Sequence, residues 1–185
     1  MKLGRLNDIH SRYPDLTVGV LGDFCLDRYL EIDPDHREVS IETGLPVYKV
    51  DRVRAQPGAA GTVLNNLAAL GVGALLPVGF CGEDGEGFEL ERCLRSLPAV
   101  SMEGFVRTPE RRTFTYCKPL LVRGGSPPVE LNRLDSKNQT PTPPELWPSC
   151  DRHSRVAWMG RCKRRLASVP CVSCSPAEAK RNAAI

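Results

Sequence analysis

The sequence predicts an α/β fold with a mainly parallel sheet flanked by helices. Two short apolar runs, 16–23 and 72–80, have the length and composition of buried strands. Apolar residues at helical spacing follow each run, in 60–71 and 85–97. Strands that alternate with helices along a chain favour parallel pairing, because each helical crossover brings the next strand back in the same direction.

The first element expected is a short amphipathic helix in "MKLGRLNDIHSRYPDL", where Leu3, Leu6, Ile9 and Tyr13 are suitably spaced. Charges interrupt these apolar residues, so the segment lacks the continuous core of a secretory signal. The next run, "LTVGVLGD", predicts a buried strand that ends in Gly-Asp. Open α/β sheets bind ligands at the carboxyl ends of their strands, which makes Asp23 a candidate site residue.

A polar, extended stretch follows, in which "PVYKVDRV" alternates as a half-exposed strand does. It leads into "QPGAAGTVLNNLAALG", where Val63, Leu67 and Leu70 predict a helix that Gly71 ends. The small residues that open this helix allow two interpretations. They permit either close packing of the helix on a strand, or close approach of backbone N–H groups to a ligand.

The segment "CGEDGEG" is predicted to be a strand-to-helix turn and not a phosphate loop. Its acidic residues would repel phosphate, and no Gly-Lys-Ser/Thr follows. Asp84 and Glu86 instead suit the positive end of the next helix, whose apolar positions are Phe88, Leu90, Leu94 and Leu97. Two further strands, "RTFTYCKPLLV" and "VELNRLD", are expected on either side of "RGGSPP".

Composition divides the chain near residue 147. Residues 147–185 hold eight basic against two acidic residues, and the rest holds 17 basic against 20 acidic. We therefore expect a mildly acidic domain over 1–146 and a basic, Cys-rich tail over 147–185 that is disordered or read out of frame. A competing interpretation of the tail is a small zinc-binding appendage. Three cysteines and one further residue would be its ligands: Cys162, Cys171 and Cys174 with Cys150 or His153.

Composition also excludes some partners. The chain has 41% hydrophobic residues, and no apolar run approaches the length of a membrane span. The basic run "RCKRR" is short and has no aromatic platform, so it indicates a solvated segment and not a nucleic-acid site. Single, scattered cysteines in the body favour reduced thiols, and we expect a cytoplasmic protein without membrane or nucleic-acid partners.

In order and spacing, the motifs of residues 16–136 resemble the ribokinase-like carbohydrate kinases, or phosphofructokinase-B family. The resemblance is nearest to the heptose-phosphate kinase half of the ADP-heptose synthase enzymes. It rests on "VGVLGDFCLDRYLEID", "ETGLPVYKVDRVRAQPGAAGTVLNNLAALG", "PVGFCGEDGEGFEL" and "RTFTYCKPLLV…VELNRLD". The family's fold adds a small β lid to the sheet and continues further on the C-terminal side.

The resemblance implies a set of substrate-binding residues. Asp23 would accept hydrogen bonds from sugar hydroxyls, and Gly58 and Ala59 occupy the place of the paired glycines that face the sugar. Asn66 matches the asparagine of the following helix, while Asp27 and Arg133 correspond less closely. The chain departs from the pattern by having alanine at 59 and threonine at 62, so the identity of the sugar is left open.

The resemblance also implies ATP- and magnesium-dependent transfer of a phosphoryl group to a sugar hydroxyl. The family's Gly-Ala-Gly-Asp segment, which supplies the catalytic base and the anion hole, does not occur in the sequence. No catalytic and no metal-ligating residue is therefore assigned, and we expect a truncated or frame-shifted kinase that is inactive alone. The alternatives are a non-catalytic fragment that binds sugar or forms a homodimer through the lid, and a nucleotide-binding module that uses "PGAAGT".

Overall fold

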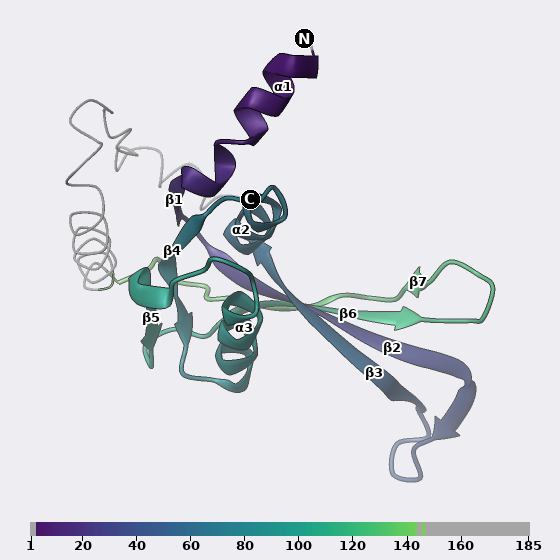
Figure 1. Cartoon of the computed structure of the whole chain (residues 1–185). Helices are drawn as coiled ribbons and strands as arrows, with labels where there is room; N and C mark the ends of the chain where they lie inside the picture. The colour runs from purple at the N-terminus through teal and green to yellow at the C-terminus, as the bar shows by residue number, and fades with distance from the viewer. Residues whose placement is uncertain (1–2, 144–145, 147–185) are drawn as a thin grey trace.

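A computed structural model describes residues 3–143 and 146, which form two sheets and three α-helices (Figure 1). The elements in chain order are α1 (Leu3–His10), η1 (Tyr13–Asp15), β1 (Thr17–Leu21), β2 (Phe24–Val39), β3 (Pro46–Ala59), α2 (Ala60–Ala69), β4 (Ala74–Gly82), α3 (Gly85–Arg95), η2 (Met102–Gly104), β5 (Phe105–Thr108), β6 (Phe114–Leu121), β7 (Val129–Glu130) and β8 (Leu134–Ser136). The tail, with its zinc alternative, lies outside the described residues.

The first sheet confirms the predicted parallel α/β arrangement. Its order is β1-β4-β5, and β4 pairs in parallel with both neighbours. β4 is the central strand, and Leu75, Leu76 and Val78 are at most 3% exposed. β1, expected to be buried, is instead an edge strand of the described sheet. Only Val20 in it is buried, and Leu21 is 73% exposed, because β4 is the one strand of the described residues that pairs with it.

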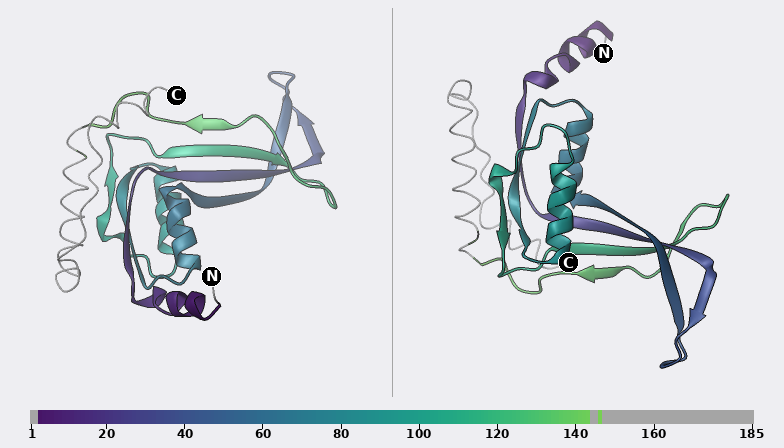
Figure 2. Two further views of the ribbon diagram at one scale, coloured as in Figure 1. Left: turned by 90° about the horizontal axis from the view of Figure 1, so that it is seen from above. Right: turned by 60° about the horizontal axis from the view of Figure 1, so that its bottom comes forward.

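The second sheet corresponds to the expected lid, but it is larger than the small lid that was expected. Its strand order is β3-β2-β6-β7, with β8 also paired to β6. The β2–β3 hairpin has strands of 16 and 14 residues and extends well away from the helices (Figures 1 and 2). β6 runs parallel to β2, whereas β7 and β8 run antiparallel to β6, so the sheet is mixed.

One hydrophobic core joins the two sheets. Leu64 of α2 and Leu90 and Leu94 of α3 are fully buried, and they share this core with Leu75 of β4 and Leu26 of β2. Because β2 and β3 contact α3 as well as α2, the base of the lid sheet is fixed to the helices.

The helices have nearly the predicted extents, and the predicted apolar face is buried in α3 but not in α2. In α2 the buried positions are Gly61 and Leu64, while Val63 is 50% and Leu70 is 47% exposed. In α3 the predicted Leu90 and Leu94 are fully buried and Leu97 packs against the core, whereas Phe88 is 63% exposed. Spacing identifies a helix, but the tertiary contacts choose which of two adjacent apolar stripes is buried.

The N-terminal helix forms as expected, yet its apolar face is uncovered. α1 projects away from the sheets, and Leu6 and Ile9 are 44% and 40% exposed (Figure 1). Within the described residues, every helix is too short or too polar to span a bilayer.

The four cysteines of the described residues are free, in agreement with the expected reduced thiols. Cys25 and Cys81 are buried, and Cys93 and Cys117 are partly buried. Burial, followed by the charge of Asp27, raises the pKa of Cys25 to about 11. Burial also raises the pKa of Cys81 to about 12, as expected for thiols in apolar surroundings.

Candidate functional site

Polar residues gather where the three parallel strands end at one edge of the sheet. Gly22 and Asp23 follow β1, Glu83 and Asp84 follow β4, and residues 109–112 follow β5. Ligands of open α/β sheets bind at this edge, because loops and helix N-termini converge there. Two depressions of the surface meet at Asp23, and a third adjoins them.

The first depression lies between β1 and α2. Asp23, Ala59, Ala60 and Val63 line it together with the residues of β1. Both Asp23 and Ala59 are exposed, so the carboxylate is accessible to hydroxyl groups of a ligand. The structure therefore brings together two of the residues that the family resemblance implies.

One part of the turn at the start of α2 is tightly packed, and another part lines this depression. The Ala60 N–H donates a hydrogen bond of 3.0 Å to the backbone carbonyl of Asp23, so that amide is occupied. A Cβ on Gly61 would lie 2.4 Å from the Cβ of Pro57, which explains the glycine by helix–strand contact. Both interpretations of the small-residue segment thus hold, at different residues: Gly61 packs, and Ala59 faces the depression.

Ala59 adopts a backbone conformation that favours glycine. Its φ is 52° and its ψ is −119°, in a region where a Cβ is in steric conflict with the backbone. Ala59 stands where the family pattern has its second glycine, and the chain keeps the glycine geometry in spite of the methyl group. The methyl group adds strain to the turn and bulk to the rim of the depression.

Gly58 contacts the lid sheet and not the depression beside Asp23. It pairs with Cys25 across the β2–β3 ladder, and a Cβ added to it would lie 2.6 Å from Cys25 Sγ and 2.7 Å from Asp27 Oδ2. The glycine is therefore needed to leave room for the Asp27 carboxylate on this face of the lid.

Asp27 is held by Lys118, a residue that sequence reasoning missed. The Lys118 Nζ lies 2.7 Å from Asp27 Oδ1, and the two side chains are 18% and 15% exposed. Burial opposes the charge of Lys118, but the hydrogen bond and the attraction of Asp27 outweigh it and raise the pKa of the lysine. A lysine within the apolar strand "TYCKPLLV" was the available signal, because a charge in such a strand requires a partner.

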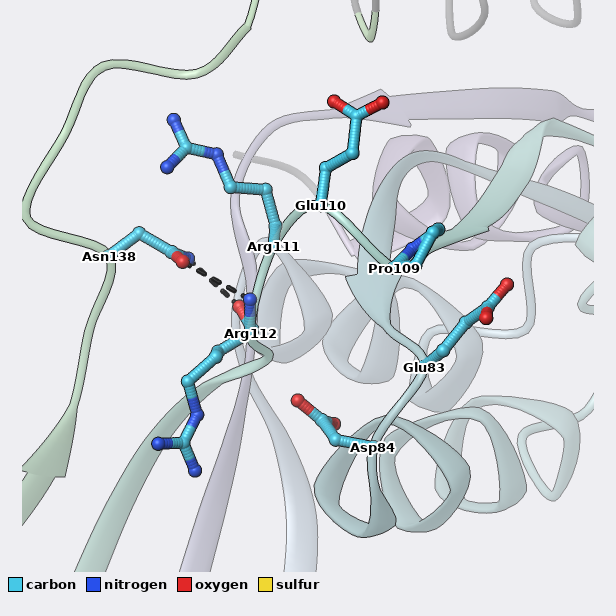
Figure 3. A pocket seen from close by; sticks show the side chains of 7 residues that line it. All are labelled: Glu83, Asp84, Pro109, Glu110, Arg111, Arg112 and Asn138. Atoms are coloured by element: carbon cyan, nitrogen blue, oxygen red, sulfur yellow. Dashed lines mark hydrogen bonds between the residues drawn. The ribbon is translucent and has the colours of Figure 1, made fainter.

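The second and third depressions share Arg112, which sequence reasoning also missed. Arg112 and Thr113 line the depression that contains Asp23 and Phe24. Arg112 also lines an adjoining polar pocket of about 250 Å³ with Glu83, Asp84, Pro109, Glu110, Arg111 and Asn138 (Figure 3). Arg112 is therefore the residue that connects the pocket of Figure 3 to Asp23.

The backbone around Arg112 is fixed on both sides. Asn138 Oδ1 accepts a hydrogen bond of 3.1 Å from the Arg112 N–H, and Asn138 Nδ2 donates one of 2.9 Å to the Arg112 carbonyl (Figure 3). The buried Arg111 donates to Thr140 and Pro141, which ties the same loop to residues 138–141. These bonds fix the backbone of Arg112 at the edge of the sheet, while its side chain is exposed.

Asp84 fixes the other end of this loop, as the predicted turn requires. Its carboxylate caps α3 by accepting a 2.7 Å hydrogen bond from the Gly87 N–H. It also accepts a 2.9 Å bond from the Thr113 N–H and a 2.7 Å bond from the Thr113 hydroxyl. Although burial raises the pKa of Asp84, these hydrogen bonds outweigh that effect and lower it.

Two of the implied residues lie elsewhere. Asn66 is on an exposed face of α2 and lines none of these depressions. Arg133 lies beside β8, where it makes a bidentate ion pair of 2.6 and 2.9 Å with Asp135 and stacks on the ring of Tyr116. It belongs to the lid sheet, as Asp27 and Gly58 do.

Sequence comparison finds relatives among the proteins called bifunctional protein HldE. The chain is 35% identical over 124 residues to the protein of Gluconobacter oxydans and 39% identical over 123 residues to that of Aliivibrio fischeri. These matches cover 67% and 66% of this chain. The family resemblance predicted from the sequence is confirmed. In the matched region the chain resembles a ribokinase-like carbohydrate kinase, nearest to the heptose-phosphate kinase half of the ADP-heptose synthase enzymes.

The chain spans about a quarter of the length of these curated relatives, 24% in both cases. No family model matches it. Among solved structures, it is similar to a carbohydrate kinase from Agrobacterium tumefaciens, with a TM-score of 0.45 and 20% identity, over 65% of this chain and 35% of the other. The ribokinase of Arabidopsis thaliana, solved with ribose and ATP, matches with a TM-score of 0.42 and 18% identity, over 62% and 35% of the two chains.

Proposed function

We propose that this chain contains the sugar-binding side and the lid of a ribokinase-like sugar or sugar-phosphate kinase. The observation that supports this most strongly is the position of Asp23. Its carboxylate is exposed at the carboxyl end of β1, in depressions that Ala59 and Arg112 also line. A carboxylate accepts hydrogen bonds from sugar hydroxyls, and the guanidinium donates to oxygen-rich or anionic groups.

In this proposal residues 1–146 form the kinase part and residues 147–185 a separate tail. Asp23 and Ala59 contact the sugar directly, and Asp27, Gly58 and Arg133 contribute from the lid. Asn66 acts by supporting α2. ATP and magnesium serve the complete family enzyme, and we expect no phosphoryl transfer by the 185-residue chain, because its sequence has no Gly-Ala-Gly-Asp segment to supply the base.

Replacing Asp23 with asparagine is expected to weaken sugar binding at least tenfold. The substitution keeps the size of the side chain but replaces charge-assisted hydrogen bonds, which contribute roughly 1.5–3 kcal/mol each. Isothermal titration of the wild-type chain and the variant with hexoses, heptoses and their phosphates measures the effect. Asp8→Asn, at an exposed position on α1, is the matched control and should bind as the wild type does. Equal affinities of D23N and the wild type would contradict the proposed site.

A second candidate function is self-association through the lid. Tyr48, Val50 and Val53 of β3 are 58%, 43% and 44% exposed, which is unusual for large apolar residues of one strand. Burial of these side chains against a second lid would stabilise a homodimer. Sedimentation velocity should then show a dimer that V50K shifts to monomer, whereas V63K in α2 should leave the dimer intact. A monomeric wild-type chain at micromolar concentration would exclude this candidate.

A further inference from the structure

We propose that Asp33, His36 and Asp51 form a binding site for a divalent transition-metal ion in the β2–β3 hairpin. One nitrogen or oxygen of each side chain lies within 4.8 Å of those of the other two. The set is mixed, with an imidazole nitrogen and two carboxylates, which is a donor combination suited to manganese, iron, cobalt, nickel and zinc. This inference is independent of the proposed kinase function.

All three residues lie at irregularities in the pairing of the two strands. Ile32 pairs with Val50 and Arg37 pairs with Tyr48, so residues 33–36 of β2 stand opposite a single residue of β3. On the other strand Arg52 pairs with Glu31, which leaves Asp51 between two paired positions without a pairing partner. A β-bulge of this kind redirects side chains, and here it turns three potential ligands from two strands toward one another.

The backbone orients both carboxylates for a shared ligand. Asp51 Oδ2 accepts a 3.0 Å hydrogen bond from the Asp33 N–H, and Asp33 Oδ1 accepts one of 2.9 Å from the Asp35 N–H. The remaining oxygens, Asp33 Oδ2 and Asp51 Oδ1, lie 3.9 and 3.7 Å from the His36 Nδ1. Each carboxylate is thus held through one oxygen and presents the other to the same imidazole nitrogen. Hydrogen bonds that orient ligating carboxylates in this way increase metal affinity.

The spacing leaves room for an ion after small side-chain rotations. Metal–ligand bonds of about 2.0–2.2 Å place adjacent ligands roughly 3 Å apart, somewhat closer than these atoms are now. The side chains of Asp33, His36 and Asp51 are 40%, 62% and 47% exposed, so they can rotate, and water can complete the coordination. An ion bound there would crosslink β2 and β3 beyond the part of the lid that packs on α3.

Manganese is the most informative probe for this site. Oxygen and imidazole ligands suit Mn²⁺, whereas the cysteines of the tail would compete strongly for zinc. Titration of the full-length, ¹⁵N-labelled chain with MnCl₂ should broaden the amide signals of residues 33, 35, 36 and 49–51 before all others, because Mn²⁺ relaxes only nearby nuclei. His36→Ala and Asp51→Asn should each weaken this local binding at least tenfold.

Asp35→Asn is the matched control. It removes one negative charge from the same bulge, leaves the Asp35 N–H that orients Asp33, and affects none of the three ligands. This variant should bind Mn²⁺ within about twofold of the wild type, and unchanged amide shifts in the parallel sheet will show that all variants are folded. Equal affinity in the wild type, H36A and D51N would overturn the proposal. Broadening centred on residues 23 and 83–84 or on the tail would overturn it too.

Discussion

Replacing Asp84 with alanine is expected to lower the free energy of unfolding by about 3 kcal/mol. The carboxylate accepts three hydrogen bonds, from the Gly87 N–H, the Thr113 N–H and the Thr113 hydroxyl. Thr113 is only 3% exposed, so water cannot replace the lost acceptor there. The substitution thus removes the cap of α3 and leaves buried donors unsatisfied. Urea denaturation, followed by circular dichroism, measures the loss.

The contribution of Asp84 to the free energy of unfolding should decrease as the pH falls. Because the pKa of Asp84 in the folded chain is below its ordinary 3.8, its contribution is fully present above that value. The contribution is lost as the pH falls through the folded pKa. Between about pH 5 and about pH 3, the free energy of unfolding should therefore fall more steeply in the wild type than in Asp84→Asn.

Glu86→Gln is the matched control for both experiments. Glu86 lies in the same first turn of α3, so the change removes a similar charge from the positive helix end. The expected cost is about 0.5 kcal/mol, the usual size of a helix-dipole effect. If E86Q costs as much as D84A, charge near the helix end and not the contact with Thr113 explains the stability.

Replacing Gly58 with alanine is expected to destabilise the chain by about 2 kcal/mol and to displace Asp27. The added Cβ would lie 2.6 Å from Cys25 Sγ and 2.7 Å from Asp27 Oδ2, both closer than such contacts allow. Since Asp27 is also bonded to Lys118, relief of the contact costs an ion pair that is mostly buried. Urea denaturation gives the stability.

The neighbouring substitution in the opposite direction serves as a contrast. Ala59→Gly should raise the free energy of unfolding by about 1 kcal/mol, because glycine adopts a φ of 52° without the strain of a Cβ. G58A adds a methyl group where there is no room for it, and A59G removes one from a strained position. The two substitutions should therefore change the free energy of unfolding in opposite directions. A destabilised A59G variant would show that its methyl group makes contacts that outweigh the backbone strain.

Sequence patterns predicted most of the helices and strands, but they predicted less accurately which residues of these elements are buried. The apolar run at 72–80 became the central strand β4, and the helix that Gly71 was expected to end finishes at Ala69. β5 was missed, because "FVRT" is too short to show a period and is recognisable only from its pairing with β4. The prediction that β1 is buried was wrong, because the position of a strand in a sheet depends on which strands pair with it.

The candidate site was predictable where it depends on local sequence. Asp23 could be placed at the carboxyl end of a strand from the run before it, and the Gly-Asp ending agrees with the structure. A lysine in an apolar strand indicated that Lys118 needs a partner, but the identity of that partner could not be predicted, nor could the place of Arg112 at the site. Both depend on contacts between residues that are far apart in the sequence. Lys118 meets Asp27 through the parallel pairing of β2 with β6.

By itself the sequence determined the alternation of the strands β1 and β4 with the helices α2 and α3, the turn at Asp84 and the likeness to the ribokinase-like kinases. These depend on local periodicity, on capping residues and on ordered motifs, all of which can be recognised along the chain. Only the tertiary structure decided which face of α2 is buried, that Gly61 packs while Ala59 lines the depression, and that Asp33, His36 and Asp51 converge. Those features follow from strand pairing and register, which join residues that are distant in the sequence.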